Sequence, residues 1–298
     1  MADSVKRAIS RGLSEGVGNP KVGAGASRPA AEAPDAFNWL RSEFEGGEML
    51  RRLTLVIPMY KEAKRIERTV ATLAASELHR RDIAFCFVDD GSPDDTVGVA
   101  ERAVAHHKLS NAEIVRLEHN QGKGGAVRSG ILRVAEHSHL VGFLDADLSL
   151  NPSEVLTALS RLELAGADAL VGDRVVEAEK QPKLRRVASL VFRRVAASLV
   201  PTGVKDSQCA MKLFRSEVAK QVFGPLETTG FAFDVEVLGR LRKGNYTVAE
   251  TPVLWEHQPG SQINAATDAV RMIRELLNIR RVLRGGTVAS ATSDARSA

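Results

Sequence analysis

The chain has 298 residues, of which 44% are hydrophobic and 26% charged, the balance of an ordinary globular protein. This composition excludes a disordered, collagen-like or multi-span membrane chain, and the length suits one large α/β domain or two small ones. The formal net charge of +4 is mildly basic and favours phosphate-bearing partners or an anionic surface. Two cysteines, Cys86 and Cys209, are too few for a disulfide framework or a zinc site, and they favour a reducing cytoplasm.

Composition also predicts how the chain is divided. Residues 14–36 are rich in glycine, alanine, serine and proline and show no periodicity, so we expect a flexible N-terminal tail over residues 1–50. Residues 285–298 are again small and polar and predict a flexible C-terminal tail. The folded domain is expected between them, at residues 51–284. No apolar run approaches the roughly 20 residues of a membrane-spanning helix, so we expect no transmembrane segment.

Between the tails, the hydrophobic pattern alternates between strands and helices. After a short helix at 37–44, it predicts a strand at 53–57, stopped by Pro58, and a helix that begins near Ile66. The elements that follow in chain order are a strand at 83–88, a helix at 95–107 capped by Asp94 or Asp95, a strand at 114–117, a helix at 125–136, and strands at 140–144 and 169–171. This alternation predicts an α/β fold, in which helices cover both faces of a mostly parallel central sheet.

Polar or glycine-rich segments stand at the ends of these five strands. They are residues 58–62, 89–92, 120–125, 145–147 and 172–174. In an open parallel sheet, ligands bind beyond the carboxyl ends of the strands. Five such segments in one sheet therefore predict a single site along one edge.

Two of the segments carry paired carboxylates. Asp145 and Asp147 leave their strand two residues apart, so both can turn onto one cation, which favours Mg²⁺ or Mn²⁺ together with substrate phosphates. The alternative for Asp147 is a cap on the helix expected after Asn151. Asp89 and Asp90 can accept hydrogen bonds from a base or a ribose hydroxyl, and their alternative is a simple turn.

The segment NQGKGG at 120–125 resembles a phosphate-binding loop but fits neither common template. No serine or threonine follows Lys123, and Val127 takes the place of the third glycine of the dinucleotide-binding motif. This disfavours a nucleotide triphosphatase and a dinucleotide-dependent enzyme. Lys123 and the neighbouring glycines still suit a closely approaching diphosphate.

The second half of the chain contains a basic amphipathic segment. Residues 184–199 place apolar side chains along one helical stripe, with lysines and arginines at its start and flanks. Such a helix can lie on an anionic membrane surface or face the core with its cationic side in water, and the pattern fits both. Nucleic acid is not expected as a partner, because aromatic residues make up only 5% of the chain and form no stacking platform.

Six motifs of the chain form a recognisable set. They are VIPMYKE at 56–62, VDDGSPD at 88–94, GKGGAVR at 122–128, DAD at 145–147, DSQCAMKLF at 206–214 and FAFDVE at 231–236. Together they resemble the family 2 inverting glycosyltransferases of the GT-A (Rossmann-like) fold, over roughly residues 52–283. Within that family, the motifs resemble those of the dolichyl-phosphate β-glucosyltransferases and, a step further away, the polyprenyl-phosphate mannose synthases.

The resemblance implies roles for the matching residues. A nucleotide-sugar donor would be held by Pro58, Tyr60, Glu62, Val88, Asp89, Asp90, Lys123, Asp145, Ala146, Asp147 and Gln262. Asp145 and Asp147 would bind Mg²⁺ or Mn²⁺, and Asp234 would lie near the sugar. Arg174, Arg185 and Ser189 match the residues that hold an acceptor phosphate. The domain would divide into a nucleotide-sugar half, 51–175, and an acceptor half, 176–284, with acceptor-side helices at its C-terminal end.

The implied reaction moves a hexose onto a polyprenyl or dolichyl phosphate at the cytoplasmic face of a membrane, with the protein bound peripherally. UDP-glucose is the preferred donor and GDP-mannose the second choice. A phosphate acceptor is mostly dianionic at neutral pH and needs no strong base, so Lys123 and Arg174 act by neutralising and positioning charge. A soluble hydroxyl acceptor is the alternative and needs a base, for which Asp234 is the candidate.

A nucleotidyltransferase is the alternative from a different class of enzyme. Such an enzyme also uses a pair of aspartates and a glycine-rich loop. It requires a glycine-rich signature with arginine and lysine directly after the first strand, and residues 58–62 (PMYKE) stand there instead. This alternative is therefore disfavoured.

Overall fold

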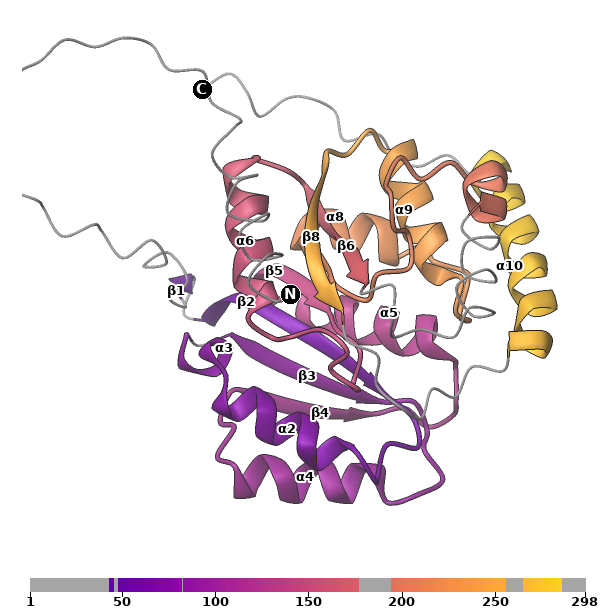
Figure 1. Ribbon diagram of the computed structural model, residues 1–298. Helices are drawn as coiled ribbons and strands as arrows, with labels where there is room; N and C mark the ends of the chain where they lie inside the picture. The colour runs from indigo at the N-terminus through magenta and orange to yellow at the C-terminus, as the bar shows by residue number, and fades with distance from the viewer. Residues whose placement is uncertain (1–42, 46–47, 82, 177–193, 256–264, 286–298) are drawn as a thin grey trace, which may run out of the picture. The chain divides into compact units, whose positions relative to one another are not determined.

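The computed structural model describes residues 43–45, 48–81, 83–176, 194–255 and 265–285 (Figure 1). All of them belong to one compact unit, Trp39–Ala298. The predicted C-terminal tail, apart from Gly285 at the end of α10, and most of the predicted N-terminal tail lie outside the described residues. The domain boundaries at 50, 175 and 284 stay predictions.

The described residues form one eight-stranded sheet. Its strands are β1 (Glu43–Glu45), β2 (Glu48–Met59), β3 (Ala84–Asp89), β4 (Ala112–Arg116), β5 (Ser138–Phe143), β6 (Ala169–Val176), β7 (Lys212–Arg215) and β8 (Val248–Trp255). They lie in the order β4-β3-β2-β5-β7-β6-β8, and β1 pairs with β2. The pairs β2–β3, β2–β5, β3–β4 and β6–β8 are parallel, whereas β7 runs antiparallel to both β5 and β6. The predicted mostly parallel sheet is thereby confirmed.

Some predicted boundaries are wrong. The strand at 53–57 does not stop at Pro58 but continues to Met59. Its pairing with β5 ends at Val56, so the missing N–H of Pro58 removes no hydrogen bond on that side. The segment 172–174 lies inside β6 rather than after it, because β8 pairs with β6 as far as Val176. The short helix predicted at 37–44 is contradicted at its end, where residues 43 and 44 belong to β1.

Helices cover both faces of the sheet, as predicted. They are α2 (Ile66–Ala75), α3 (Glu77–Arg80), α4 (Thr96–His106), α5 (Lys123–Val134), α6 (Glu154–Leu164), α8 (Ser216–Phe223), α9 (Phe233–Lys243) and α10 (Ala265–Gly285), and residues 194–199 are also helical. Apolar side chains of α5, α8 and α9 pack on alternate strand residues such as Val56 and Phe143. The residues between them, such as Leu55 and Ile57, point to the opposite face and are also fully buried. The helices α2 and α4 lie on that opposite face. They connect β2 to β3 and β3 to β4, whereas α5 connects β4 to β5 in the reverse direction along the sheet. Because all these crossovers are right-handed, opposite directions place the helices on opposite faces.

The C-terminal helix extends this core. In α10, Leu276 and Ile279 pack with Val235 of α9 and with Ala196 and Val200. Figure 1 shows α10 in yellow beside α9 in orange. Among the described residues, no helix combines the length and the apolar character that crossing a membrane requires.

Close packing of α5 on the sheet predicts a cost for enlarging Gly130. A Cβ at this position would lie 2.5 Å from Val56 Cγ1 and 2.8 Å from Val88 Cγ2. Because that overlap outweighs the gain in helix propensity, we expect Gly130→Ala to lower the free energy of unfolding by on the order of 1 kcal/mol. Urea denaturation measures this, with Arg133→Ala, an exposed change on the same helix, as the control. A Gly130→Ala protein as stable as the wild type would contradict the packing described.

Candidate functional site

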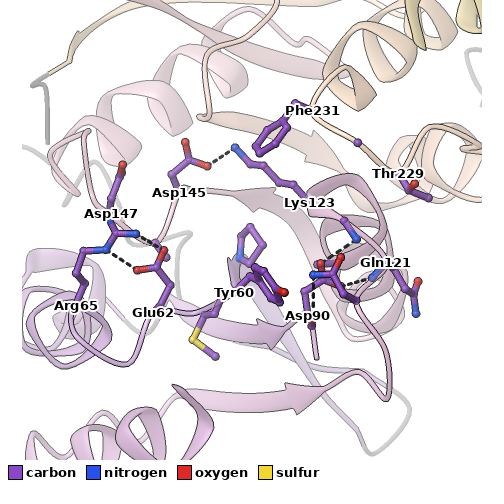
Figure 2. A pocket seen from close by; sticks show the side chains of 17 residues that line it. Tyr60, Glu62, Arg65, Asp90, Gln121, Lys123, Asp145, Asp147, Thr229 and Phe231 are labelled. Carbon is purple, nitrogen blue, oxygen red and sulfur yellow. Dashed lines mark hydrogen bonds and ion pairs between the residues drawn. The ribbon is translucent and has the colours of Figure 1, made fainter. Parts of the chain in front are cut away.

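A cavity of about 620 Å³ lies beyond the carboxyl ends of β2, β3 and β5 (Figure 2). Eight of the residues predicted to bind a nucleotide sugar line it. Pro58 lies near the end of β2, and Tyr60 and Glu62 follow that strand. Asp90 follows β3, Lys123 begins α5, and Asp145, Ala146 and Asp147 follow β5. Four of the five predicted segments therefore contribute to one cavity, whereas segment 172–174, which includes Arg174, contributes no residue to its lining.

Other predicted site residues lie elsewhere. Val88 and Asp89 are fully buried in β3, and Asp89 accepts a hydrogen bond from the Ser92 N–H at 3.0 Å. Neither lines the cavity, because β3 continues through both before the chain leaves the sheet. Gln262, Arg185 and Ser189 lie outside the described residues.

The carboxylate of Asp90 ties the end of β3 to the start of α5. It accepts hydrogen bonds from the backbone N–H groups of Gln121 at 2.7 Å and Gly122 at 2.9 Å. Burial raises the pKa of Asp90 above its ordinary value, and the two N–H groups act in the opposite direction. Gly122 has φ +86°, and a Cβ there would lie 2.6 Å from the carbonyl oxygen of Thr229. This glycine therefore makes room for a neighbouring loop of the protein.

Lys123 carries its ammonium group from the first turn of α5 to the end of β5. Its Nζ lies 2.5 Å from Oδ1 of Asp145, and Figure 2 shows the two side chains pointing toward each other. Burial lowers the pKa of Lys123, but the negative charges of Asp145, Asp234 and Asp147 together raise it above the ordinary value. The lysine is therefore cationic at neutral pH.

A second ion pair lies at the cavity wall. Glu62 accepts two hydrogen bonds from Arg65, each at 2.7 Å, in the bidentate geometry that arginine favours. Burial raises the pKa of Glu62, Arg65 opposes this shift, and the nearby charges of Asp147 and Asp145 add to it. The cavity thus holds several carboxylates close together, with cations beside them.

Asp145 and Asp147 have the donor chemistry of a site for a hard divalent cation. Carboxylate oxygens are the ligands that Mg²⁺ and Mn²⁺ prefer. Asp145 already pairs with one cation, the ammonium group of Lys123. No group of three or more His, Cys, Asp or Glu side chains suited to a metal occurs in the described part of the chain. Because Mg²⁺ commonly keeps waters and binds substrate phosphates, two protein carboxylates are a sufficient set.

The alternative role for Asp147, as a helix cap, is wrong. Its Oδ1 accepts hydrogen bonds from the N–H of Ser149 at 2.9 Å and from the Ser149 hydroxyl at 2.8 Å. Helix α6 begins only at Glu154, with Ser153 at its N-cap position. Asp147 therefore stabilises the turn after β5 and leaves its other oxygen, Oδ2, outside these hydrogen bonds.

Asp234, the predicted base, is buried on α9 and does not line the cavity. Its Oδ1 lies 2.6 Å from the Nζ of Lys212, a fully buried lysine at the start of β7. Burial raises the pKa of Asp234, while Lys212 and Lys123 act to lower it. Glu236, two residues further on, is fully buried and paired with Arg240. Both carboxylates are thus held in the interior of the protein.

Arg174, predicted to bind the acceptor phosphate, lies in β6. Its Nε and Nη2 donate to the two oxygens of Asp206 at 2.6 and 2.9 Å. This pair leaves Nη1 outside the bidentate contact, and 23% of the arginine side chain is exposed. The guanidinium group is therefore oriented by Asp206 and still reachable from outside.

Some residues of the cavity wall were not predicted from the sequence. Thr229, Gly230 and Phe231 come from the loop between α8 and α9, and Arg65 comes from just before α2. The first three directly precede or begin the FAFDVE motif, and that proximity was the available signal. No pattern in the sequence indicated Arg65, because its contact with Glu62 forms only when the chain turns into α2.

The ion pair between Asp206 and Arg174 makes the stability of the folded protein depend on pH, because it forms only while Asp206 is ionised. Burial raises the pKa of Asp206, but the opposing effect of Arg174 and its neighbours is larger in total, so the folded pKa lies below the ordinary value of 3.8. The stabilisation is therefore complete above about pH 4 and is lost as the pH falls through the folded pKa. Asp206→Asn should lower the free energy of unfolding at pH 7 by about 3 kcal/mol and flatten its fall in acid.

Urea denaturation between pH 2 and 7 measures both effects. Asp95→Asn is the matched control, because Asp95 pairs with Arg102 at the exposed surface. The control should leave stability nearly unchanged. If the two variants behave alike, the buried pair does not contribute as described.

Proteins of known family match this chain along most of the domain. The family model described as Glycosyl transferase family 2 matches residues 54–223, more than half of the chain. The dolichyl-phosphate beta-glucosyltransferase of Saccharomyces cerevisiae is 31% identical over 248 residues, which cover 76% of this chain and 74% of that protein. The protein of the same name from Homo sapiens is 30% identical over 243 residues, covering 77% and 75%.

A solved structure shares the fold. Glucosyl-3-phosphoglycerate synthase from Mycobacterium tuberculosis, crystallised with Mn²⁺, UDP-glucose and phosphoglyceric acid, matches with a TM-score of 0.59 and 18% identity, over 77% of this chain and 79% of that chain. At this identity the likeness concerns the fold alone. The expected family is thus confirmed by the sequence comparisons and the expected fold by the solved structure. The chain belongs to glycosyltransferase family 2, has the GT-A fold and is a glycosyltransferase.

Proposed function

We propose that this enzyme transfers glucose from UDP-glucose to a polyprenyl phosphate of the dolichyl type, with Mg²⁺ or Mn²⁺ held by Asp145 and Asp147. The observation that carries the proposal is the cavity at the carboxyl edge of the sheet, which gathers the two carboxylates with Lys123 and Tyr60. The names of relatives at 30 and 31% identity support glucose as the sugar and dolichyl phosphate as the acceptor.

The donor in this proposal lies along the cavity. Tyr60 and Asp90, at the ends of the neighbouring strands β2 and β3, hold the nucleoside. Asp145 and Asp147 would hold the metal ion, which when bound would supply positive charge to neutralise the diphosphate leaving group. Lys123 adds a fixed positive charge at the same end of the cavity, where negative charge grows as the bond to the sugar breaks.

The acceptor phosphate in this proposal is held by Arg174, Arg185 and Ser189. A lipid monophosphate is mostly dianionic at neutral pH, so it attacks without a strong base and needs cations that position it. Arg174 meets this need, since Asp206 fixes the plane of its guanidinium group while part of the side chain remains exposed. Arg185 and Ser189 belong to the basic segment at 184–199, most of which lies outside the described residues.

We also propose that the protein acts peripherally at the cytoplasmic face of a membrane. A lipid acceptor requires contact with a bilayer, and the positive charge of the basic segment at 184–199 suits an anionic surface. In the described part of this segment the apolar residues Val195 and Leu199 pack on the core, so the proposed contact with the surface is electrostatic. Exposed arginines on α10, Arg274, Arg281 and Arg284, add positive charge. Both cysteines are free and buried, which is compatible with a reducing compartment.

The first test is sugar transfer from labelled UDP-glucose and GDP-mannose, with Mg²⁺ or Mn²⁺, in the presence and absence of polyprenyl phosphate. We expect label from UDP-glucose to enter the organic phase only when lipid phosphate is present. Lipid product from GDP-mannose instead would replace the donor in the proposal. Donor hydrolysis without lipid product would indicate a soluble acceptor, and release of pyrophosphate would indicate a nucleotidyltransferase.

The second test concerns the proposed metal ligands. Asp147→Asn removes a negative charge but keeps an oxygen that can accept from Ser149, so the turn after β5 should survive. We expect transfer to fall by about 100-fold or more, the range for removing one group that stabilises charge in the transition state. Binding of Mn²⁺ in the presence of UDP, measured by calorimetry, should weaken in parallel. Asp95→Asn, a change at an exposed carboxylate that does not line the cavity, serves as the control, and equal loss in both variants would contradict the assignment.

A further inference from the structure

One wall of the cavity is built outside the sheet. Thr229, Gly230 and Phe231 line the cavity from the loop that precedes α9, and Figure 2 shows Phe231 near the Lys123–Asp145 pair. These three residues lie beyond the segment 54–223 that the family model covers. Their position depends on contacts with α5, α9 and α10.

The beginning of this loop is fixed by α5 and α9. The Gly124 N–H donates to the carbonyl oxygen of Thr229 at 2.8 Å. The carboxylate of Glu236 accepts hydrogen bonds from the N–H groups of Glu227 at 3.1 Å and Thr228 at 2.8 Å. Residues 227–229 are thus held by groups inside the core of the domain.

The end of the loop is held by a different element, α10. Oε2 of Glu275 accepts a hydrogen bond from the backbone N–H of Ala232 at 3.1 Å. The same carboxylate lies so close to Gly230 that any Cβ at that position would overlap with its oxygens. Helix α10 is itself anchored, because Leu276 and Ile279 pack against the core beside α9. Glu275 therefore connects a packed helix to the cavity wall.

We propose that Glu275 is a positioning residue, which holds the part of the wall formed by Gly230 and Phe231 in the place that donor binding requires. A charged acceptor strengthens the hydrogen bond from Ala232, and the side chain also fills the space beside Gly230. The identity of the donor as UDP-glucose rests on the function proposed above, whereas the positioning of the loop does not.

Two readouts separate these questions. Hydrogen exchange of the peptide that spans residues 229–232 reports on the loop without any ligand. Titration with UDP-glucose and Mn²⁺ reports on donor affinity. We expect Glu275→Ala to speed exchange in this peptide but not at 227–228, which Glu236 holds, and to weaken donor affinity by about tenfold, the size expected for losing one hydrogen bond to a charged group.

Matched variants distinguish positioning from a loss of folding. Glu275→Gln keeps an oxygen that can accept from Ala232, so it should restore most of the exchange protection and donor affinity. Asn278→Ala, an exposed change on the same helix, should resemble the wild type. Gly230→Ala should weaken binding in the wild-type background, yet add little to Glu275→Ala, because the carboxylate that it overlaps is gone.

The outcomes are distinguishable. Unchanged exchange at 229–232 in a folded Glu275→Ala protein would overturn the proposal, whatever the ligand. Faster exchange with unchanged affinity for UDP-glucose would overturn its consequence for binding. If the wild type binds no UDP-glucose, the proposed donor is wrong, and the exchange experiment still decides the role of Glu275.

Discussion

The geometry of the site depends on the carboxylate of Asp90, which accepts hydrogen bonds from the backbone. Asp90 accepts from the N–H groups of Gln121 and Gly122, so the end of β3 fixes where α5 begins. That starting point decides where Lys123 stands, and Lys123 in turn meets Asp145 at the end of β5. A helix placed one turn earlier or later would move its residues by about 5 Å, and the ion pair would be lost. The place of Lys123 in the cavity thus follows from two hydrogen bonds that backbone N–H groups donate to the Asp90 carboxylate.

Positively and negatively charged side chains alternate around this cavity. Lys212 is fully buried and paired with Asp234, and Asp234 lies near Lys123, which pairs with Asp145. Burying charge is costly unless each group has a partner, so no member of this set can be removed without leaving another uncompensated. An arrangement of this kind keeps Lys123 charged and in place, which is what a cation facing a diphosphate requires.

The sequence predicted the half of the site that depends on local pattern. Apolar strands followed by polar ends identified Glu62, Asp90, Asp145 and Asp147 as neighbours, because parallel strands bring their carboxyl ends to one edge. It did not predict β7 or β8, whose places follow from pairing with strands more than 35 residues away. The wall at 229–231 was missed for the same reason, since Glu275 reaches it from a helix over 40 residues further on.

The burial of Asp234 bears on the choice of acceptor. A base for a sugar hydroxyl has to reach the proton it removes, within hydrogen-bond distance or through one water. Asp234 does not line the cavity, and one of its oxygens is engaged by Lys212. A phosphate acceptor supplies its own negative charge and needs arginines instead. Arg174 does not line the cavity either, but Asp206 orients its guanidinium group and 23% of its side chain is exposed. The burial of Asp234 and its pairing with Lys212 therefore favour a phosphate acceptor over a hydroxyl acceptor in the proposed reaction.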